Sequence, residues 1–173
     1  MNSTGPSGAG SDPTGGHPRP DQPPPPPVAV LLDREPVTMA DDYESRLRRV
    51  EFGPDAMIGD VLIEMIRGLP SVAASVSWTI WARNHPRLRY SSDGAATSIV
   101  PAAGEQVRCA FVSAPYQAEK QIVHIGGFSA STMLQTSYLT PAATGEYVFQ
   151  AVYHTSGLVG LSAYQEWVGG LRR

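Results

Sequence analysis

The amino-acid sequence predicts a mainly β protein, an antiparallel β-sandwich with two N-terminal α-helices and a disordered Pro/Gly-rich tail. Three observations lead to this fold class. Nine prolines and five glycines lie in residues 1–27, 14 of the charged side chains lie in residues 33–67, and only 12 lie in residues 71–173. After Pro70 the apolar residues also change from a helical period to an alternating one. The composition therefore divides the chain into a tail, a charged helical part and a weakly charged β part.

These divisions give the expected domain organisation. We expect a disordered tail over residues 1–38, a helical segment over residues 39–70, and a β-sandwich domain over residues 71–173 that packs with the helices. Residues 1–27 contain no Leu, Ile, Val or Phe, so they cannot bury enough apolar surface to offset the entropy of ordering. The start of translation stays open between Met1 and Met39.

The tail ends in an unbroken proline run, Pro23–Pro27. Such a run favours the polyproline II conformation, which acts either as a stiff spacer or as a ligand for an aromatic groove. The spacer is the commoner use.

Two helices are expected next. Asp41 or Asp42 can cap a helix that runs to about Glu51. A second helix is expected over residues 54–69, because its apolar residues recur at helical spacing and Gly68 is typical of a helix end. The apolar face of this second helix either packs on the sheet or lies in a lipid interface.

Short strands separated by glycines and prolines follow. Val76, Trp78 and Ile80 alternate with polar residues and form the first of them, before a break at Asn84. The later candidates are strands at residues 97–100, 106–113, 121–125, 132–139, 146–154 and 158–167. No long helix is expected between them, which disfavours an alternating parallel architecture.

Residues 97–167 resemble an immunoglobulin-like domain. Phe111 and Phe149 stand where that family has its two disulfide cysteines, and residues 134–139 followed by Tyr147 resemble its penultimate pair of strands with the tyrosine corner. The resemblance implies a sandwich with two phenylalanines between its sheets.

A second resemblance is one of layout. From Met57 to Phe111 an amphipathic helix is followed by a strand, a polar turn and further strands, an order similar to that of actinoporin-type pore-forming proteins. This resemblance implies a membrane-active protein that inserts the helix at residues 54–69.

Charge and cysteine content limit the class of partner and the compartment. The formal net charge is −3 and there is no large basic cluster, so nucleic-acid binding is not expected. The single cysteine, Cys109, lies in an apolar alternation and suggests a buried thiol in a reducing compartment. No apolar stretch has the length of a signal peptide or a membrane span. We therefore expect a cytoplasmic protein, and the preference for Arg over Lys suggests a bacterium or phage.

No catalytic pattern stands out. The four histidines lack the paired spacing of metal ligands, and Ser129 with His124 does not lie in a nucleophile elbow. We expect no enzyme, no metal and no cofactor.

The expected function is that of a protein-interaction or assembly module that binds a protein partner, or itself, through sheet edges and loops. The contributing residues are expected to be Trp81, Tyr116, His154 and Gly157. Trp81 lies on the side of its strand opposite Trp78, and would be an anchor if the helices leave that side uncovered. The membrane-active alternative uses the helix at residues 54–69.

Overall fold

The computed structural model describes residues 25–37, 46–70, 76–100, 105–115, 118–154 and 165. Eight strands, one α-helix and one turn of 3₁₀ helix occur in these ranges. They are β1 (Val28–Arg34), β2 (Arg48–Phe52), α1 (Ile58–Gly68), β3 (Val76–Asn84), β4 (Leu88–Tyr90), β5 (Ala96–Ile99), β6 (Glu105–Ala114), β7 (Gln121–Ile125), η2 (Leu134–Thr136) and β8 (Tyr147–His154). The expected mainly β fold is confirmed.

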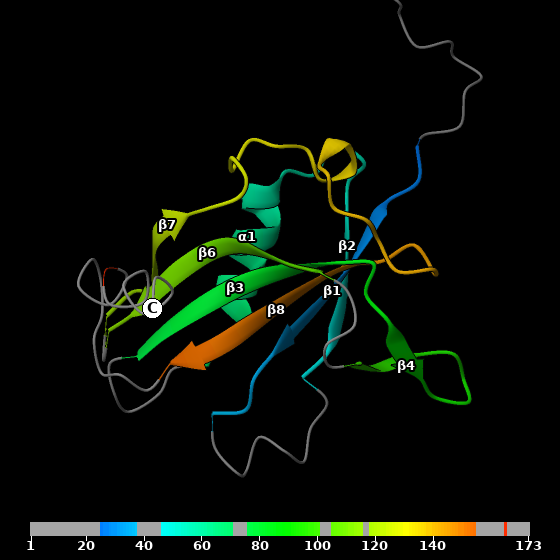
Figure 1. The fold of residues 1–173 in the computed structure, drawn as a ribbon, viewed down its shortest axis with the longest axis horizontal. Helices are drawn as coiled ribbons and strands as arrows, with labels where there is room; N and C mark the ends of the chain where they lie inside the picture. Colours follow the sequence, from blue (N-terminus) through cyan, green and yellow to red (C-terminus); the bar gives the residue numbers. More distant parts are fainter. Residues whose placement is uncertain are drawn as a thin grey trace, which may run out of the picture.

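Six strands form one mixed sheet in the order β2-β1-β8-β3-β6-β7 (Figure 1). Most neighbours are antiparallel, but β1 runs parallel to β8, with Val30 opposite Tyr147. The expected wholly antiparallel pairing is therefore wrong at this position, because the chain returns through β8 to the centre of the sheet and meets β1 in the same direction. β4 and β5 form a separate two-stranded sheet.

The hydrophobic core lies between the sheet and α1, which crosses one face of it (Figure 1). We call this the helix face and the other side the opposite face. The helix contributes five buried side chains to this core, Ile58, Val61, Leu62, Met65 and the following Leu69, which meet Trp78, Ile80 and Phe149 of the sheet. The second expected helix is thus confirmed with a later start, and its apolar face is covered by the sheet.

The opposite face carries the hairpin β4–β5 at one end, where Leu31 and Val148 pack with Ile99. Among the described residues this hairpin is the only second β layer. The expected sandwich of two packed sheets is not confirmed within those residues, where the six-stranded sheet has a helix on one face and a short hairpin on the other.

Two elements differ from the expected N-terminal part. Residues 28–34, which the composition places in the tail, form β1, because pairing with β2 and β8 on both sides satisfies their backbone and buries Val30, Leu31 and Leu32. Residues 48–52, expected within the first helix, form β2. Tertiary pairing with β1 here outweighs the helix propensity of Arg and Glu. Residues 1–24 and 38–45 of these two segments lie outside the described residues.

The details of the immunoglobulin-like resemblance are not met. Phe111 lies opposite Thr79 and Phe149 opposite Ala82, which are on opposite faces of β3, so the two rings do not face each other. Residues 134–136, expected within a strand, form a turn of 3₁₀ helix. The backbone of this region is used instead to fix a loop against α1, as described below.

Candidate interaction surface

The two edges of the six-stranded sheet differ in charge. On β2 the Arg48 guanidinium contacts the Glu64 carboxylate of α1 at 2.6 Å, and Arg49 contacts Glu51 at 2.5 Å. Charged side chains on an edge strand oppose pairing with another chain. The sequence of β7, Gln-Ile-Val-His-Ile, has no Asp, Glu, Lys or Arg. The charged side chains of β2 therefore oppose the pairing of another strand with that edge, whereas β7 has no such charges.

The β7 edge pairs on one side only within the described part of the chain. Its partner there is β6, with Ile125 opposite Ala110 and Gln121 opposite Ser113. Val123 is an extra residue in this ladder, a bulge that shortens the regular edge. Ile122 and Ile125 pack against the core, which holds β7 in place, and its outer edge has no strand partner among the described residues.

The uncharged character of β7 continues into the loop that follows it. Residues 121–145 contain no Asp, Glu, Lys or Arg. The structure describes this whole segment, which runs from β7 over the end of the sheet to η2 and on toward β8 (Figure 1). The β7 edge and this loop thus belong to one segment without Asp, Glu, Lys or Arg.

Backbone hydrogen bonds fix the loop to the start of α1. The N–H of Ile58 donates to the Thr132 carbonyl at 2.8 Å, and the N–H of Gly59 donates to the Ala130 carbonyl at 2.9 Å. These donors belong to the first turn of the helix, where no carbonyl within the helix is available to accept from them. A Cβ on Gly59 would lie 3.0 Å from the Ala130 oxygen, so glycine permits this close approach. The loop therefore has a defined position.

An open hollow of about 670 Å³ lies on this loop, lined by residues 127–129, 132 and 136–138. The rings of Phe128 and Tyr138 are stacked, with centroids 4.7 Å apart and planes 19° apart. Phe128 packs against the core, and Tyr138 is 60% exposed, the highest value among the large apolar side chains of the described residues. The Tyr138 hydroxyl donates to the Gly127 carbonyl at 3.2 Å, which fixes the direction of the ring. We call this feature the aromatic hollow.

Gly127 makes the turn beneath the hollow possible. Its φ is +80°, and a Cβ there would lie 2.6 Å from the Arg108 carbonyl oxygen of β6. Only glycine accepts both conditions without strain.

Two of the expected site residues lie on the opposite face of the sheet. Trp81 is paired with Gln150, and His154 is paired with Ser77, so both side chains are on the side away from α1. Trp81 is partly buried and lies on the side of the sheet that α1 does not cover, and its role as an anchor stays a prediction. The Arg108 guanidinium lies 5.9 Å from the centre of the Trp81 ring. The other two expected residues, Tyr116 and Gly157, lie outside the described residues.

His154 is partly buried at the end of β8. Its Nε2 lies 2.6 Å from the Thr79 hydroxyl, and its ring stacks on Phe111 with centroids 6.5 Å apart. Burial lowers the pKa of His154, and the nearby carboxylate of Glu35 opposes that change. The imidazole is therefore mainly neutral at pH 7 and forms part of the packing of this face.

A short polar network crosses the same face between β1, β8 and β3. The amide of Gln150 donates to the Asp33 carboxylate at 3.1 Å, and its oxygen accepts from the Arg83 Nε at 3.2 Å. Burial raises the pKa of Asp33 and lowers the pKa of Arg83. The amide links two groups of opposite charge that are partly removed from water. Their hydrogen bonds satisfy these partly buried polar groups, so we assign the network a structural role.

Two nucleophilic side chains of the described residues are Cys109 and Ser129. Burial raises the pKa of the Cys109 thiol to about 12, so it has almost no thiolate at neutral pH. The Ser129 hydroxyl is bonded to that of Ser131 at 2.9 Å. No group of three His, Cys, Asp or Glu side chains in the described ranges is placed to hold a metal ion.

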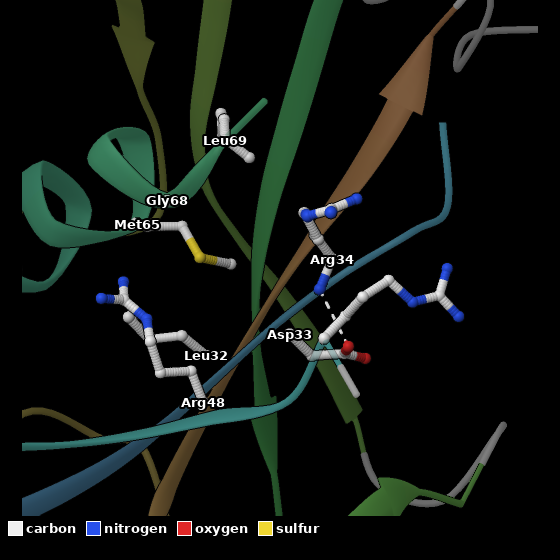
Figure 2. Close-up of a pocket in the computed structure, with 8 residues that line it drawn as sticks. Leu32, Asp33, Arg34, Arg48, Met65, Gly68 and Leu69 are labelled. Atoms are coloured by element: carbon white, nitrogen blue, oxygen red, sulfur yellow. Dashed lines mark hydrogen bonds between the residues drawn. The ribbon is translucent and has the colours of Figure 1, made fainter. Parts of the chain in front are cut away.

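A small cavity lies between the end of α1, the end of β1 and the start of β2 (Figure 2). Its volume is about 40 Å³, and its lining combines Leu32 and Met65 with Arg34, Arg48 and Asp33. One or two water molecules would fill this space, whereas sites for organic ligands usually have several hundred Å³. Since Arg48 is already bonded to Glu64 and to the carbonyl of the same residue, we interpret the cavity as a packing defect around an ion pair.

No protein-family model, no curated protein and no solved structure matches this chain. In the part of the chain that the structure describes, no helix has both the length and the apolar character needed to cross a membrane.

Sequence reasoning missed the aromatic hollow. Phe128 and Tyr138 are ten residues apart and belong to segments expected to be a loop and a strand. The signal that could have indicated the region is the 25-residue neutral segment from Gln121 to Gly145, which is rich in Ser, Thr and Gly. Loops that bind proteins often combine Tyr with Ser and Gly, because a rigid ring gives contact area and small residues give adaptable hydrogen bonds.

Proposed function

We propose that this chain is a non-enzymatic protein-interaction module of a bacterium or phage, which accepts an extended segment of a partner, or of another copy, on the β7 edge. The observation that carries this proposal is the contrast between the two sheet edges. The β2 edge has Arg48, Arg49 and Glu51 in ion pairs, whereas β7 is neutral and contains three β-branched residues. Edge strands without charge are templates for an added strand.

The geometry indicates weak, reversible binding. β7 has five residues, and the bulge at Val123 interrupts the regular edge, so an added strand would form only a few backbone hydrogen bonds. Each such bond contributes about 0.5–1.5 kcal/mol net. Further affinity must come from side chains next to the edge, and the neutral loop at residues 126–138 is continuous with it.

The membrane-active alternative has no supporting observation of its own. It requires α1 to leave the sheet and expose Ile58, Val61, Leu62, Met65 and Leu69, all of which are buried. Exposing five such side chains costs about 10 kcal/mol at about 2 kcal/mol each, which is comparable with the whole stability of a domain. We therefore do not propose it.

Site-specific photo-crosslinking of the full chain tests the edge proposal. A photoreactive residue replaces the exposed Gln121 on β7 or, as the matched control, the exposed Glu51 on β2. We expect a discrete adduct, with a partner or with a second copy, from position 121 and not from position 51. Val123→Lys should suppress this adduct by placing a charge on the edge. Equal yields from both positions, or an adduct that Val123→Lys leaves unchanged, would contradict the proposal.

A further inference from the structure

We propose that the aromatic hollow binds the proline run Pro23–Pro27 of a second copy of this chain. This inference rests on the proposed interaction function, but it uses a different surface from the β7 edge. The contact joins a tail of one molecule to a hollow of the next. Because the two surfaces differ, repetition of the contact would build a chain or a ring of copies.

The hollow has the chemistry that a polyproline II helix requires. Proline-rich segments bind grooves lined by aromatic rings, where flat proline rings pack against flat aromatic faces. The stacked pair of Phe128 and Tyr138 offers such a surface, with Phe128 seated against the core and Tyr138 largely exposed. No charged residue lines the hollow, so a neutral ligand enters it without leaving a charge unpaired.

The hydrogen-bonding groups of the rim also match. Proline has no backbone N–H, so a proline run presents carbonyl acceptors and needs donors from its receptor. Ser129 and Thr132, two residues with a hydroxyl group, line the hollow. Within the described residues the Thr132 hydroxyl has no hydrogen-bond partner, and that of Ser129 is shared with Ser131. Both can turn toward a carbonyl oxygen.

The hollow is formed before any ligand arrives. The Tyr138 hydroxyl is bonded to Gly127, and the loop is bonded to the first turn of α1 through Thr132 and Ala130. A polyproline II helix is likewise formed in advance, with three residues per turn and a rise of about 3.1 Å per residue. Little conformational entropy is then lost on binding, which favours a contact as small as one or two turns of proline helix.

The proline run belongs to the same chain as the aromatic hollow, but its described residues do not lie in the hollow of that chain. Pro25, Pro26 and Pro27 are exposed, directly precede β1, and are not among the residues that line the hollow. In the sheet, β1 is separated from β7 by the three strands β8, β3 and β6. An exposed run next to Val28 is thus presented to a neighbouring molecule.

Two complementary variants of the full chain test this inference. The first keeps the hollow and has the prolines of Pro23–Pro27 replaced by alternating Gly and Ser. The second keeps the prolines and carries Tyr138→Ala. Sedimentation velocity should show that the wild-type chain forms oligomers larger than dimers as its concentration rises, that each variant alone remains monomeric, and that an equimolar mixture forms a dimer and stops there. The second variant can serve only as ligand and the first only as receptor.

Tyr90→Ala is the matched control, since Tyr90 is 43% exposed and lies on β4, away from the hollow. It should associate as the wild type does, while Tyr138→Ala weakens association at least about tenfold. Far-UV circular dichroism should be the same for all variants, because neither tyrosine is among the buried core side chains.

The remaining outcomes overturn this inference in distinguishable ways. A mixture of the two variants that stays monomeric removes the contact. If each variant alone still associates as strongly as the wild type, self-association must use another surface. If Val123→Lys then suppresses that association, the β7-edge proposal is supported and this inference is not. A monomeric wild type, together with binding of a synthetic peptide of residues 17–27 by the first variant, would mean that the run binds within one molecule and not between copies.

Discussion

Truncation of Leu62 tests whether α1 is a permanent part of the core. Leu62 is fully buried on the helix face, whereas the neighbouring Ile63 is 48% exposed on the outer side of the same helix. Leu62→Ala removes three carbon atoms, worth about 2.4 kcal/mol at about 0.8 kcal/mol per buried carbon. A residual void of about 50 Å³ adds about 1.2 kcal/mol at about 24 cal/mol per Å³. We therefore expect a loss of about 3–4 kcal/mol in the free energy of unfolding.

Ile63→Ala is the matched control. About half of the Ile63 side chain stays exposed to water in the folded protein, so its burial contributes only about half of the full hydrophobic free energy. Alanine is also the better helix former, and we therefore expect the free energy of unfolding to fall by less than about 1 kcal/mol. Equilibrium urea unfolding followed by far-UV circular dichroism measures both, with an unchanged dependence on urea as the sign of a two-state transition. Equal effects of the two substitutions, or a loss below about 1 kcal/mol for Leu62→Ala, would refute the packing described here and reopen the lipid-interface use of the helix.

Three further predictions concern single groups. Asn84→Ala should cost about 1–3 kcal/mol in urea unfolding, because the Asn84 side-chain oxygen accepts from the N–H of Thr140 at 2.9 Å and its loss leaves that donor without a partner. The pKa of His154 is lowered in the folded state by burial, so its contribution to stability is complete above the unfolded pKa of about 6.5 and declines as the pH falls below it; the free energy of unfolding should fall between pH 7.5 and pH 5.5, and less steeply in His154→Gln. The Cys109 thiol, whose pKa burial raises to about 12, should react with a thiol reagent much more slowly in the native protein than in urea, and equal rates would contradict its burial.

The elements that the sequence predicted well are those in which local pattern and tertiary environment agree. The strand expected over residues 121–125 coincides with β7, and the helix expected over residues 54–69 contains α1. In α1 the apolar residues repeat at helical spacing, and Asp60 accepts a hydrogen bond from the N–H of Met57, which fixes the start. Local signals of this kind need no knowledge of distant partners.

The elements that it predicted badly depend on distant partners. Residues 48–52 contain Arg and Glu at spacings that suit a helix, but they pair with β1, whose own residues follow a proline run and were assigned to the tail. The turn at residues 134–136 replaces an expected strand because this part of the chain is bonded to the start of α1, more than 70 residues earlier in the sequence. No window of sequence records these contacts.

The candidate surfaces divide in the same way. The alternation in β3 was enough to place Trp81 on the side away from Trp78, since successive side chains of a strand point to opposite faces. That β7 lies at an edge, and that Phe128 meets Tyr138, depends on strand order and on the path of a loop, neither of which alternation specifies.

The sequence by itself determined that this protein is mainly β, that an amphipathic helix within residues 54–69 has an apolar face to bury, and that charge is concentrated before Pro70. These properties follow from composition and from periods of two and 3.6, which act over a few residues. The tertiary structure alone decided that the N-terminal strand joins the sheet in parallel, that β7 is the uncharged edge, and that two distant aromatic rings form an exposed hollow. Those decisions arise from pairing between residues far apart in the chain, where burial and backbone hydrogen bonds outweigh local preference.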